Sequence, residues 1–228
     1  MPADRFFTPV SLKTSSLSLE GEELHHLAKV MRVRPGETIE LVNGRGELAT
    51  AELISLDKKT AHLKILSHET ATPPPPLILA QAVTRTASLE WIIEKGTELG
   101  ATEFWLFPGE KSEKKNLALQ RLETIQINAL KQCGRLFLPH LALKPPLQEW
   151  PPPSGSLFFG DLSPHAPPLK GPFDSPVIFF IGPEKGFSTS ELATLSRFKA
   201  RGISLHSNIL RAETAAIAAL AQFYTAFF

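Results

Sequence analysis

The sequence predicts an α/β protein in which a small, mostly β part precedes a larger part built on a parallel sheet. Residues 37–66 contain runs in which apolar and polar residues alternate, the pattern of half-buried strands. From residue 77 onward, apolar strand-like runs alternate with helical patterns, which is typical of a parallel sheet covered by helices. Between the two parts, "ATPPPP" at residues 71–76 favours polyproline II and predicts a linker.

The first part, residues 1–70, is predicted to be a small barrel-like β domain with one helix ahead of its strands. "NGRG" at 43–46 is a hairpin signal, and Asp57-Lys58-Lys59 marks a second turn. These turns join strands expected at 37–43, 47–56 and 60–66, and the helix is expected over "EGEELHHLAKVMR", residues 20–32.

The second part, residues 77–228, is predicted to alternate between strands and helices. Strands are expected at 77–83, 103–108, 156–160, 176–182 and 203–206, and helices at 88–100, 116–133, 188–199 and 212–227. Ligands bind at the carboxyl ends of the strands in such sheets. The loops 159–161, 182–187 and 206–211 are therefore predicted to form the walls of one pocket.

Composition limits the kind of protein this can be. The chain has 228 residues and a net charge of +1, so any nucleic-acid surface must be local. One cysteine, Cys133, excludes an internal disulfide and a zinc site built from cysteines. His25 and His26 are adjacent and point apart on a helix, so we expect no metal. Without a run of 18 apolar residues or a signal peptide, we expect a cytoplasmic protein that does not enter a membrane.

The stretch "IGPEKGFSTSEL", residues 181–192, places a glycine-framed loop between an apolar strand and a helix. Ser188 and Glu191 predict a capping box at the start of that helix. The loop matches neither a Walker A motif nor the dinucleotide-binding glycine pattern, and Glu184 would repel a phosphate. It therefore suits a ligand that carries donors or positive charge, or it is an ordinary turn with a solvent-facing glutamate.

A second unusual stretch is "SNILRAETAAIAAL", residues 207–220. Arg211 and Glu213 open a helix that is otherwise alanine and aliphatic, so they have a function or pair with each other or across loops. The alanines either reflect helix propensity or permit close helix–helix approach. We favour the second explanation, an interface such as a dimer seam.

Basic residues gather in two places. Residues 111–135 hold six Lys or Arg against two Glu, a local charge of 6 − 2 = +4. The N-terminal part offers Arg5, His25, Lys29 and Arg32, and Gln132 and Arg135 close the long helix. Such clusters position RNA through its phosphates, or they are solvated helix faces.

Five motifs in order resemble the RsmE family, the small-subunit rRNA uracil-N3 methyltransferases of the SPOUT superfamily. They are "HHLAKVMR" (25–32), "TELG" (97–100), "QCGR" (132–135), "GPEKGF" (182–187) and "ILRAETA" (209–215). The resemblance implies a PUA-like β-barrel over 1–70, then a SPOUT α/β domain over 77–228 with a C-terminal trefoil knot. It also implies S-adenosylmethionine as cofactor, 16S rRNA as substrate and a homodimer.

The resemblance assigns roles to residues of this chain. The catalytic residues would be Arg211 and Glu184. Arg211 would stabilise negative charge on the uracil oxygens. Glu184, or alternatively Glu213, would accept the N3 proton or orient Arg211. The target base would leave its stack to enter the pocket. RNA-binding residues would be Arg5, His25, Lys29, Arg32, Arg85, Gln132 and Arg135. Cofactor-binding residues would be Phe159, Gly160, Ile181, Gly182, Pro183, Glu184, Gly186, Leu205, Ile209, Leu210, Arg211 and Ala215.

This chain departs from the family pattern at several positions. Lys185 stands where "GPEGGF" has glycine, and it would cost about 1–2 kcal/mol if that position needs a positive φ. His206 replaces a glycine and Asn208 an arginine. These changes keep two alternatives open: a noncatalytic RNA-binding protein on the same scaffold, and a SPOUT methyltransferase for another RNA position.

Overall fold

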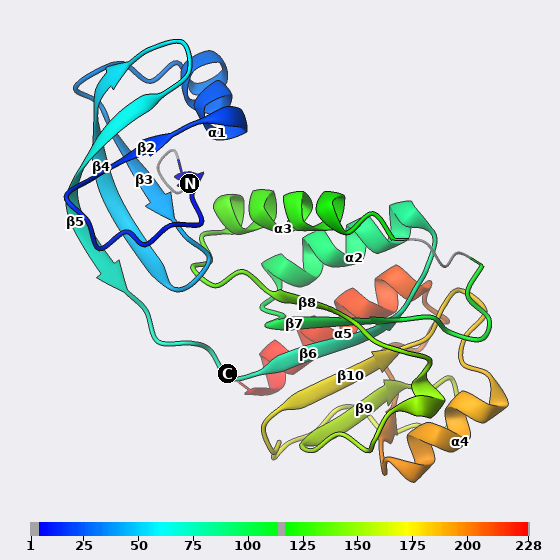
Figure 1. Cartoon of the computed structure of the whole chain (residues 1–228). Coiled ribbons are helices and arrows are strands. Elements are labelled where there is room, and N and C mark those ends of the chain that lie inside the picture. Colours follow the sequence, from blue (N-terminus) through cyan, green and yellow to red (C-terminus); the bar gives the residue numbers. More distant parts are fainter. Residues whose placement is uncertain (1–4, 114–116, 228) are drawn as a thin grey trace. The chain divides into compact units, whose positions relative to one another are not determined.

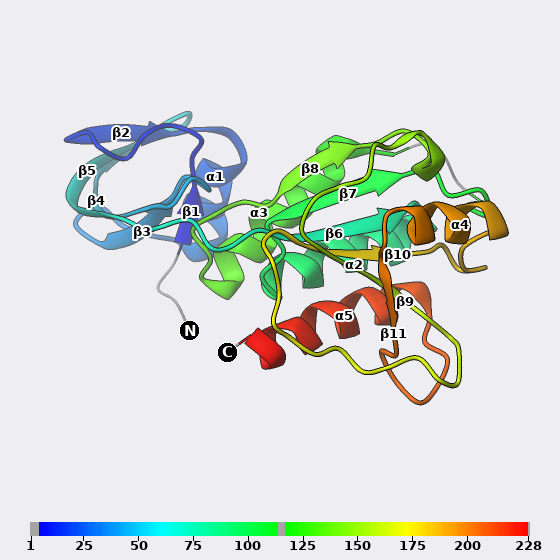
Figure 2. The ribbon, with the colours of Figure 1, turned by 90° about the horizontal axis from the view of Figure 1, so that it is seen from below.

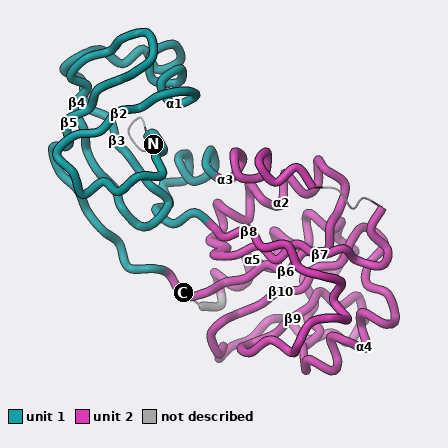
Figure 3. The backbone as a smooth tube through the Cα atoms, viewed as in Figure 1, with its two compact units in different colours: residues 1–73, 127–138 teal, residues 74–126, 139–228 magenta. Residues whose placement is uncertain are grey.

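The computed structural model describes residues 5–113 and 117–227, with side chains placed up to Thr225. The chain forms two compact units, which Figure 3 distinguishes by colour. The first unit comprises Met1–Pro73 with Ile127–Leu138, and the second comprises Pro74–Gln126 with Pro139–Phe228. Lys114 and Lys115 of the predicted basic cluster, and residue 116 of the predicted long helix, lie outside the described residues.

The first unit holds a five-stranded sheet in the order β1-β3-β4-β5-β2. Its strands are β1 (Arg5–Phe7), β2 (Ser16–Leu19), β3 (Thr38–Val42), β4 (Glu47–Leu56) and β5 (Ala61–Thr70). Both predicted hairpins are confirmed, because β3–β4 and β4–β5 are antiparallel. Register shifts at Thr50/Ala51 and Leu53/Ser55 mark irregularities of the kind that bend a sheet, and the strands curl into a half-barrel (Figure 2).

The predicted helix over 20–32 is confirmed, but its second half is wider than an α-helix. α1 (Gly21–His25) continues as a π-helical segment, His26–Met31, which ends at Arg32 with a φ of 57°. Leu24 and Leu27 point into the core of this unit, with Phe6 and Leu41 from the sheet. The helix thus closes the half-barrel through the apolar face that the sequence contains.

Residues 127–138 join the first unit through backbone pairing with the hairpin at Gly44–Gly46. The Gly46 N–H donates to Leu136 O, and the Leu138 N–H donates to Gly44 O, both at 2.8 Å. The Phe137 ring lies where a Cβ on Gly46 would stand, 2.3 Å from its nearest atom, so only glycine fits there. The glycines of the hairpin turn therefore also pair with a segment about ninety residues away. No local sequence pattern indicates this pairing.

The second unit is a six-stranded parallel sheet in the order β11-β9-β10-β6-β7-β8. Its strands are β6 (Leu77–Ala82), β7 (Glu103–Phe107), β8 (His140–Leu143), β9 (Ser156–Gly160), β10 (Val177–Ile181) and β11 (Arg201–Ile203). The parallel α/β prediction is confirmed. β6 and β10 are buried at every residue, as expected for strands covered on both faces.

The long helices lie close to where the sequence places them. They are α2 (Thr86–Glu98), α3 (Leu119–Cys133), α4 (Thr189–Arg197) and α5 (Ala212–Phe227). Among the described residues, α2, α4, α5 and the first part of α3 cover this sheet. Leu77 and Leu79 face the core shared with α2 and α5, while Ile78 and Ala80 face the core shared with α4. Figure 1 shows α4 apart from α2 and α5, as this two-sided packing requires.

The last strand is displaced from its predicted position at 203–206. β11 ends at Ile203, and the Ser204 N–H donates to Pro167 O at 2.8 Å, outside the main ladder. Ile203 and Leu205 are both buried. The apolar alternation therefore continues past the end of the strand, which is why the sequence places the strand too late.

The trefoil knot implied by the resemblance stays a prediction. No helix in the described ranges is long and apolar enough to cross a membrane.

Candidate functional site

The three predicted loops meet in one pocket at the carboxyl ends of the strands. Its cavity measures about 440 Å³, a size suited to a small-molecule ligand. Loop 182–187 follows β10, residues 160–162 follow β9, and residues 209–215 lead into α5. The pocket therefore has walls from three chain segments that only the sheet brings together.

Most of the predicted cofactor residues line this pocket. They are Phe159, Gly160, Ile181, Gly182, Pro183, Glu184, Gly186, Ile209, Leu210 and Ala215. Leu205 and Arg211 do not line it: Leu205 is buried beneath Gly160, 3.0 Å from the position of a Cβ there, and Arg211 is exposed. The lining residues that the sequence reasoning omitted are Asp161, Leu162, Lys185, Phe187, Leu192 and Ala212.

Two glycines set the shape of loop 182–187. A Cβ on Gly182 would lie 3.0 Å from Phe187 N and 3.2 Å from Gly186 C, because the loop folds tightly back on itself. Gly186 has a φ of +67°, and its N–H donates to Pro183 O at 2.8 Å. Lys185 is not among the residues with positive φ in the described ranges. The backbone strain that a lysine would cause at a positive φ therefore does not arise here.

The predicted capping box at the start of α4 is confirmed. Ser188 Oγ accepts from the Glu191 N–H at 3.1 Å, and Glu191 Oε2 accepts from the Ser188 N–H at 2.7 Å. The second Glu191 oxygen, Oε1, accepts from the Glu110 N–H at 3.1 Å, and Glu191 is fully buried. A single buried carboxylate thus joins the end of the loop to the segment that follows β7.

Glu184 is exposed, but its carboxylate has a hydrogen-bond partner. Its Oε1 accepts a hydrogen bond from the Arg85 N–H at 2.9 Å, and Arg85 is the N-cap residue of α2. A carboxylate is favourable there because the amides at a helix start lack partners within the helix. Glu184 therefore ties the pocket loop to the start of α2.

Arg211 and Glu213 stand at the entrance of α5 without the mutual salt bridge that was one alternative. Neither residue takes part in an ion pair of the described chain. The Arg211 carbonyl accepts from the Ala215 N–H at 2.8 Å, which fixes the backbone at the helix start. The guanidinium is left exposed next to pocket residues Leu210 and Ala212.

The predicted RNA-binding residues differ in their availability. In the first unit, His25, Lys29, Arg32 and Gln132 are exposed, and Arg135 is half-buried. Arg5, also in that unit, has a side chain only 9% exposed and binds Glu40 with two hydrogen bonds, at 2.6 and 2.9 Å. In the second unit, Arg85 is exposed and pairs with Glu113.

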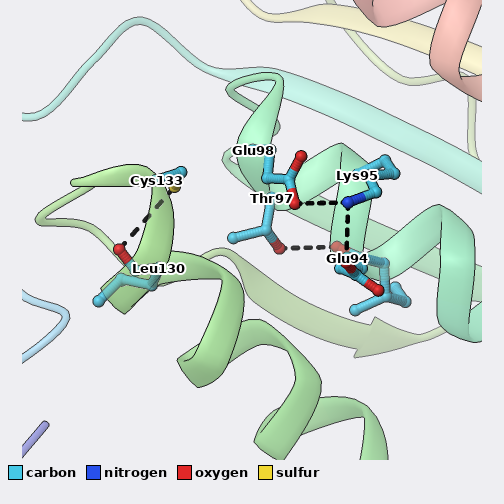
Figure 4. Close-up of polar contacts among 7 residues, drawn as sticks. Glu94, Lys95, Thr97, Glu98, Leu130 and Cys133 are labelled. Atoms are coloured by element: carbon cyan, nitrogen blue, oxygen red, sulfur yellow. Dashed lines mark hydrogen bonds and ion pairs between the residues drawn. The ribbon is translucent and has the colours of Figure 1, made fainter. Parts of the chain in front are cut away.

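The "TELG" motif stabilises the end of α2. Thr97 is fully buried and donates its hydroxyl to Ile93 O at 2.7 Å. Lys95 donates to Glu94 and Glu98, both at 2.8 Å (Figure 4), and these bonds raise the pKa of Lys95. Gly100 follows the helix with a φ of +94°, as predicted for a residue just past its end.

No group of three or more potential metal ligands occurs among the described residues.

Sequence comparison gives the family. Residues 71–224 match the family described as RNA methyltransferase domain, and residues 19–66 match the RNA methyltransferase PUA domain. Ribosomal RNA small subunit methyltransferase E of Helicobacter pylori strain 26695 is 31% identical over 233 residues, covering 96% of this chain and 99% of the relative. The chain belongs to this family, RsmE.

A second RsmE protein agrees in sequence, and two solved structures agree in fold. The Bacillus subtilis RsmE is 28% identical over 225 residues, with 90% of this chain and 88% of the relative covered. The Neisseria gonorrhoeae RsmE, solved bound to S-adenosyl methionine, superposes with a TM-score of 0.88 at 27% identity over 98% of this chain and 97% of that one. A Legionella pneumophila methyltransferase solved with the same cofactor gives 0.86 at 27% identity, covering 99% and 98% of the two chains.

Proposed function

We propose that this protein transfers a methyl group from S-adenosylmethionine to N3 of a uridine in small-subunit (16S) rRNA. The observation that carries the proposal is the pocket formed by loops 159–162, 182–187 and 209–215. It lies at the carboxyl ends of the strands in an RsmE-family chain, and relatives of the same fold were solved with this cofactor.

The pocket residues fit such a cofactor. Gly160, Gly182 and Gly186 leave backbone surface that a ligand can approach, and Phe159 and Leu210 offer apolar walls. The Glu184 carboxylate adds negative charge near a ligand that is cationic at sulfur. When bound, the cofactor supplies an electrophilic methyl group. Lys185 lines the same pocket without backbone strain, which supports an active enzyme over a scaffold that has lost its cofactor site.

The chain's own residues would prepare the uracil. N3 is a weak acid and must lose its proton before it can attack a methyl group, which leaves negative charge on the flanking carbonyl oxygens. The guanidinium of Arg211 is exposed and forms no ion pair with the described residues, so it can donate to such an oxygen with its planar fork. Glu213, two residues on and half-buried, is the candidate base next to it, because Glu184 is engaged with the Arg85 amide.

The remaining parts of the proposal concern partners and location. His25, Lys29, Arg32 and Gln132 provide exposed polar and cationic contacts for RNA. α5 would contribute to a homodimer, and the protein would act in the cytoplasm, where ribosomal subunits are assembled. No metal is required for this chemistry.

The test is methyl transfer to the proposed substrate. Purified protein is incubated with labelled S-adenosylmethionine and small ribosomal subunits from cells that lack the modification, and the rRNA is digested to nucleosides for mass spectrometry. We expect N3-methyluridine with the native protein and a loss of about 10²–10³-fold in rate with Arg211→Ala. Label in a ribose 2′-O-methyl nucleoside, or no label, would overturn the proposal.

A further inference from the structure

We propose that Glu113 is a positioning residue that holds two cations, Lys185 and Arg85, at the rim of the cofactor pocket. It thereby adjusts the pocket both to a cationic cofactor and to anionic RNA. The inference rests on the proposed function and adds to it a residue that lies in none of the motifs shared with the family.

The contacts of Glu113 join two elements that are far apart in sequence. Its Oε1 lies 3.3 Å from Lys185 Nζ, and its Oε2 accepts from Arg85 Nε at 3.2 Å and Nη2 at 3.1 Å. Lys185 lines the pocket. The backbone N–H of Arg85 in turn donates to Glu184, the residue before Lys185. Glu113 therefore closes a ring of contacts between the pocket loop and the start of α2.

The segment that carries Glu113 is itself attached to the pocket loop. Lys111 Nζ donates to Phe187 O at 2.8 Å and to Lys185 O at 3.5 Å. The Glu110 N–H donates to the buried carboxylate of Glu191 at 3.1 Å. These contacts attach Lys111 and Glu110, two and three residues before Glu113, to the pocket loop and to the start of α4.

The negative charge of Glu113 should have opposite effects on the binding of the cofactor and of the RNA. Lys185, Arg85 and Glu113 together carry 2 − 1 = +1, and removing the carboxylate raises this to +2. A glutamate is already charged at neutral pH, and the contacts with Lys185 first and Arg85 second lower the pKa of Glu113 further. More positive charge at the rim disfavours a sulfonium cofactor and favours RNA phosphates, over the range of a Debye length of about 8–10 Å.

The experiment measures both affinities in one variant. Glu113→Gln keeps the size of the side chain and removes its charge. We expect S-adenosylmethionine to bind about two- to fivefold more weakly and purified 16S rRNA to bind more tightly by a similar factor at low salt. S-adenosylhomocysteine, whose sulfur is neutral, should lose less affinity than S-adenosylmethionine. All three differences should shrink at 1 M salt. Glu149→Gln, an exposed glutamate of the same unit, is the matched control and should change none of them.

Several results would overturn the inference. If Glu113→Gln binds both cofactor and RNA more weakly, the substitution has only disturbed the structure. If it binds both as the native protein does, Glu113 has no role in either affinity. Losses of equal size for S-adenosylmethionine and S-adenosylhomocysteine, or a loss that is the same at low salt and at 1 M salt, would show that Glu113 does not act through its charge. Failure of the native protein to bind S-adenosylmethionine contradicts the proposed function instead, so the two claims fail separately.

Discussion

The Glu184 carboxylate shows how a single contact changes the interpretation of a residue. One of its oxygens accepts from the Arg85 N–H at 2.9 Å, so at the residue scale its evident role is to hold the pocket loop against α2. A general base must be within hydrogen-bond reach of the proton that it removes. Glu213 lies two residues from Arg211 at the start of α5 and is half-buried, which makes it the carboxylate nearest to the guanidinium in sequence.

Two substitutions at Glu184 separate these roles. Glu184→Gln keeps an oxygen that can accept from the Arg85 N–H, so we expect kcat to be nearly unchanged. Glu184→Ala removes that acceptor and should weaken cofactor binding by about fivefold, the effect of one lost hydrogen bond. Steady-state kinetics and calorimetric titration of both variants measure this. A loss of about 10²–10⁴-fold in kcat for Glu184→Gln would instead identify Glu184 as the base.

The loop residues show what sequence reasoning could and could not reach at this scale. The capping box of Ser188 and Glu191 was predictable because its partners are three residues apart. The environment of Lys185 was not predictable from the sequence. Its backbone conformation depends on the positive φ of Gly186, and its partner Glu113 lies 185 − 113 = 72 residues earlier. Contacts over such separations are set by the packing of the sheet.

At the scale of elements, local periodicity predicted the buried strands and the four long helices but missed short strands with distant partners. β1 has three residues and pairs with β3, and β8 has four residues and pairs with β7. Runs this short contain too few residues to show a period. The same limit applies to 127–138, whose membership in the first unit depends on pairing with Gly44 and Gly46.

The join between the end of β7 and the start of α4 is expected to be sensitive to acid. Hydrogen bonds from Ser190 and then Ser188 lower the pKa of Glu110 below its ordinary value of 4.5. A lowered carboxyl pKa adds stability that is present above 4.5 and is lost as the pH falls through the folded-state pKa. Urea unfolding should therefore show a smaller decrease in stability between pH 7 and pH 3 for Glu110→Gln than for the native chain. Identical decreases would contradict this.

At the scale of the whole molecule, α5 presents two different sides. Ala216, Ala219, Leu220 and Phe223 pack into the core of the second unit. Ala218 is half-buried and also packs against that core, while on the other side Ala221 is half-buried and Tyr224 is 52% exposed. Small residues permit close approach of a second helix, so we propose that the homodimer uses the part of α5 around Ala221.

Light scattering after size-exclusion chromatography tests this surface. The native protein should elute at about 2 × 25.0 = 50.0 kDa. Ala221→Arg places a long cation between the helices and should shift the mass to that of one chain, while circular dichroism stays native. Native protein that elutes as a single chain at every concentration would contradict a dimer built on α5.

The account as a whole depends on the pocket of three loops being the cofactor site. Calorimetric titration of S-adenosylmethionine into the native protein, Gly182→Ala and Lys185→Gly tests this most directly. We predict a dissociation constant on the order of 1–100 µM for the native chain, a clear loss for Gly182→Ala, whose Cβ would displace the loop, and binding no more than slightly changed for Lys185→Gly. Native protein that binds no cofactor until Lys185 is replaced by glycine would contradict an active methyltransferase.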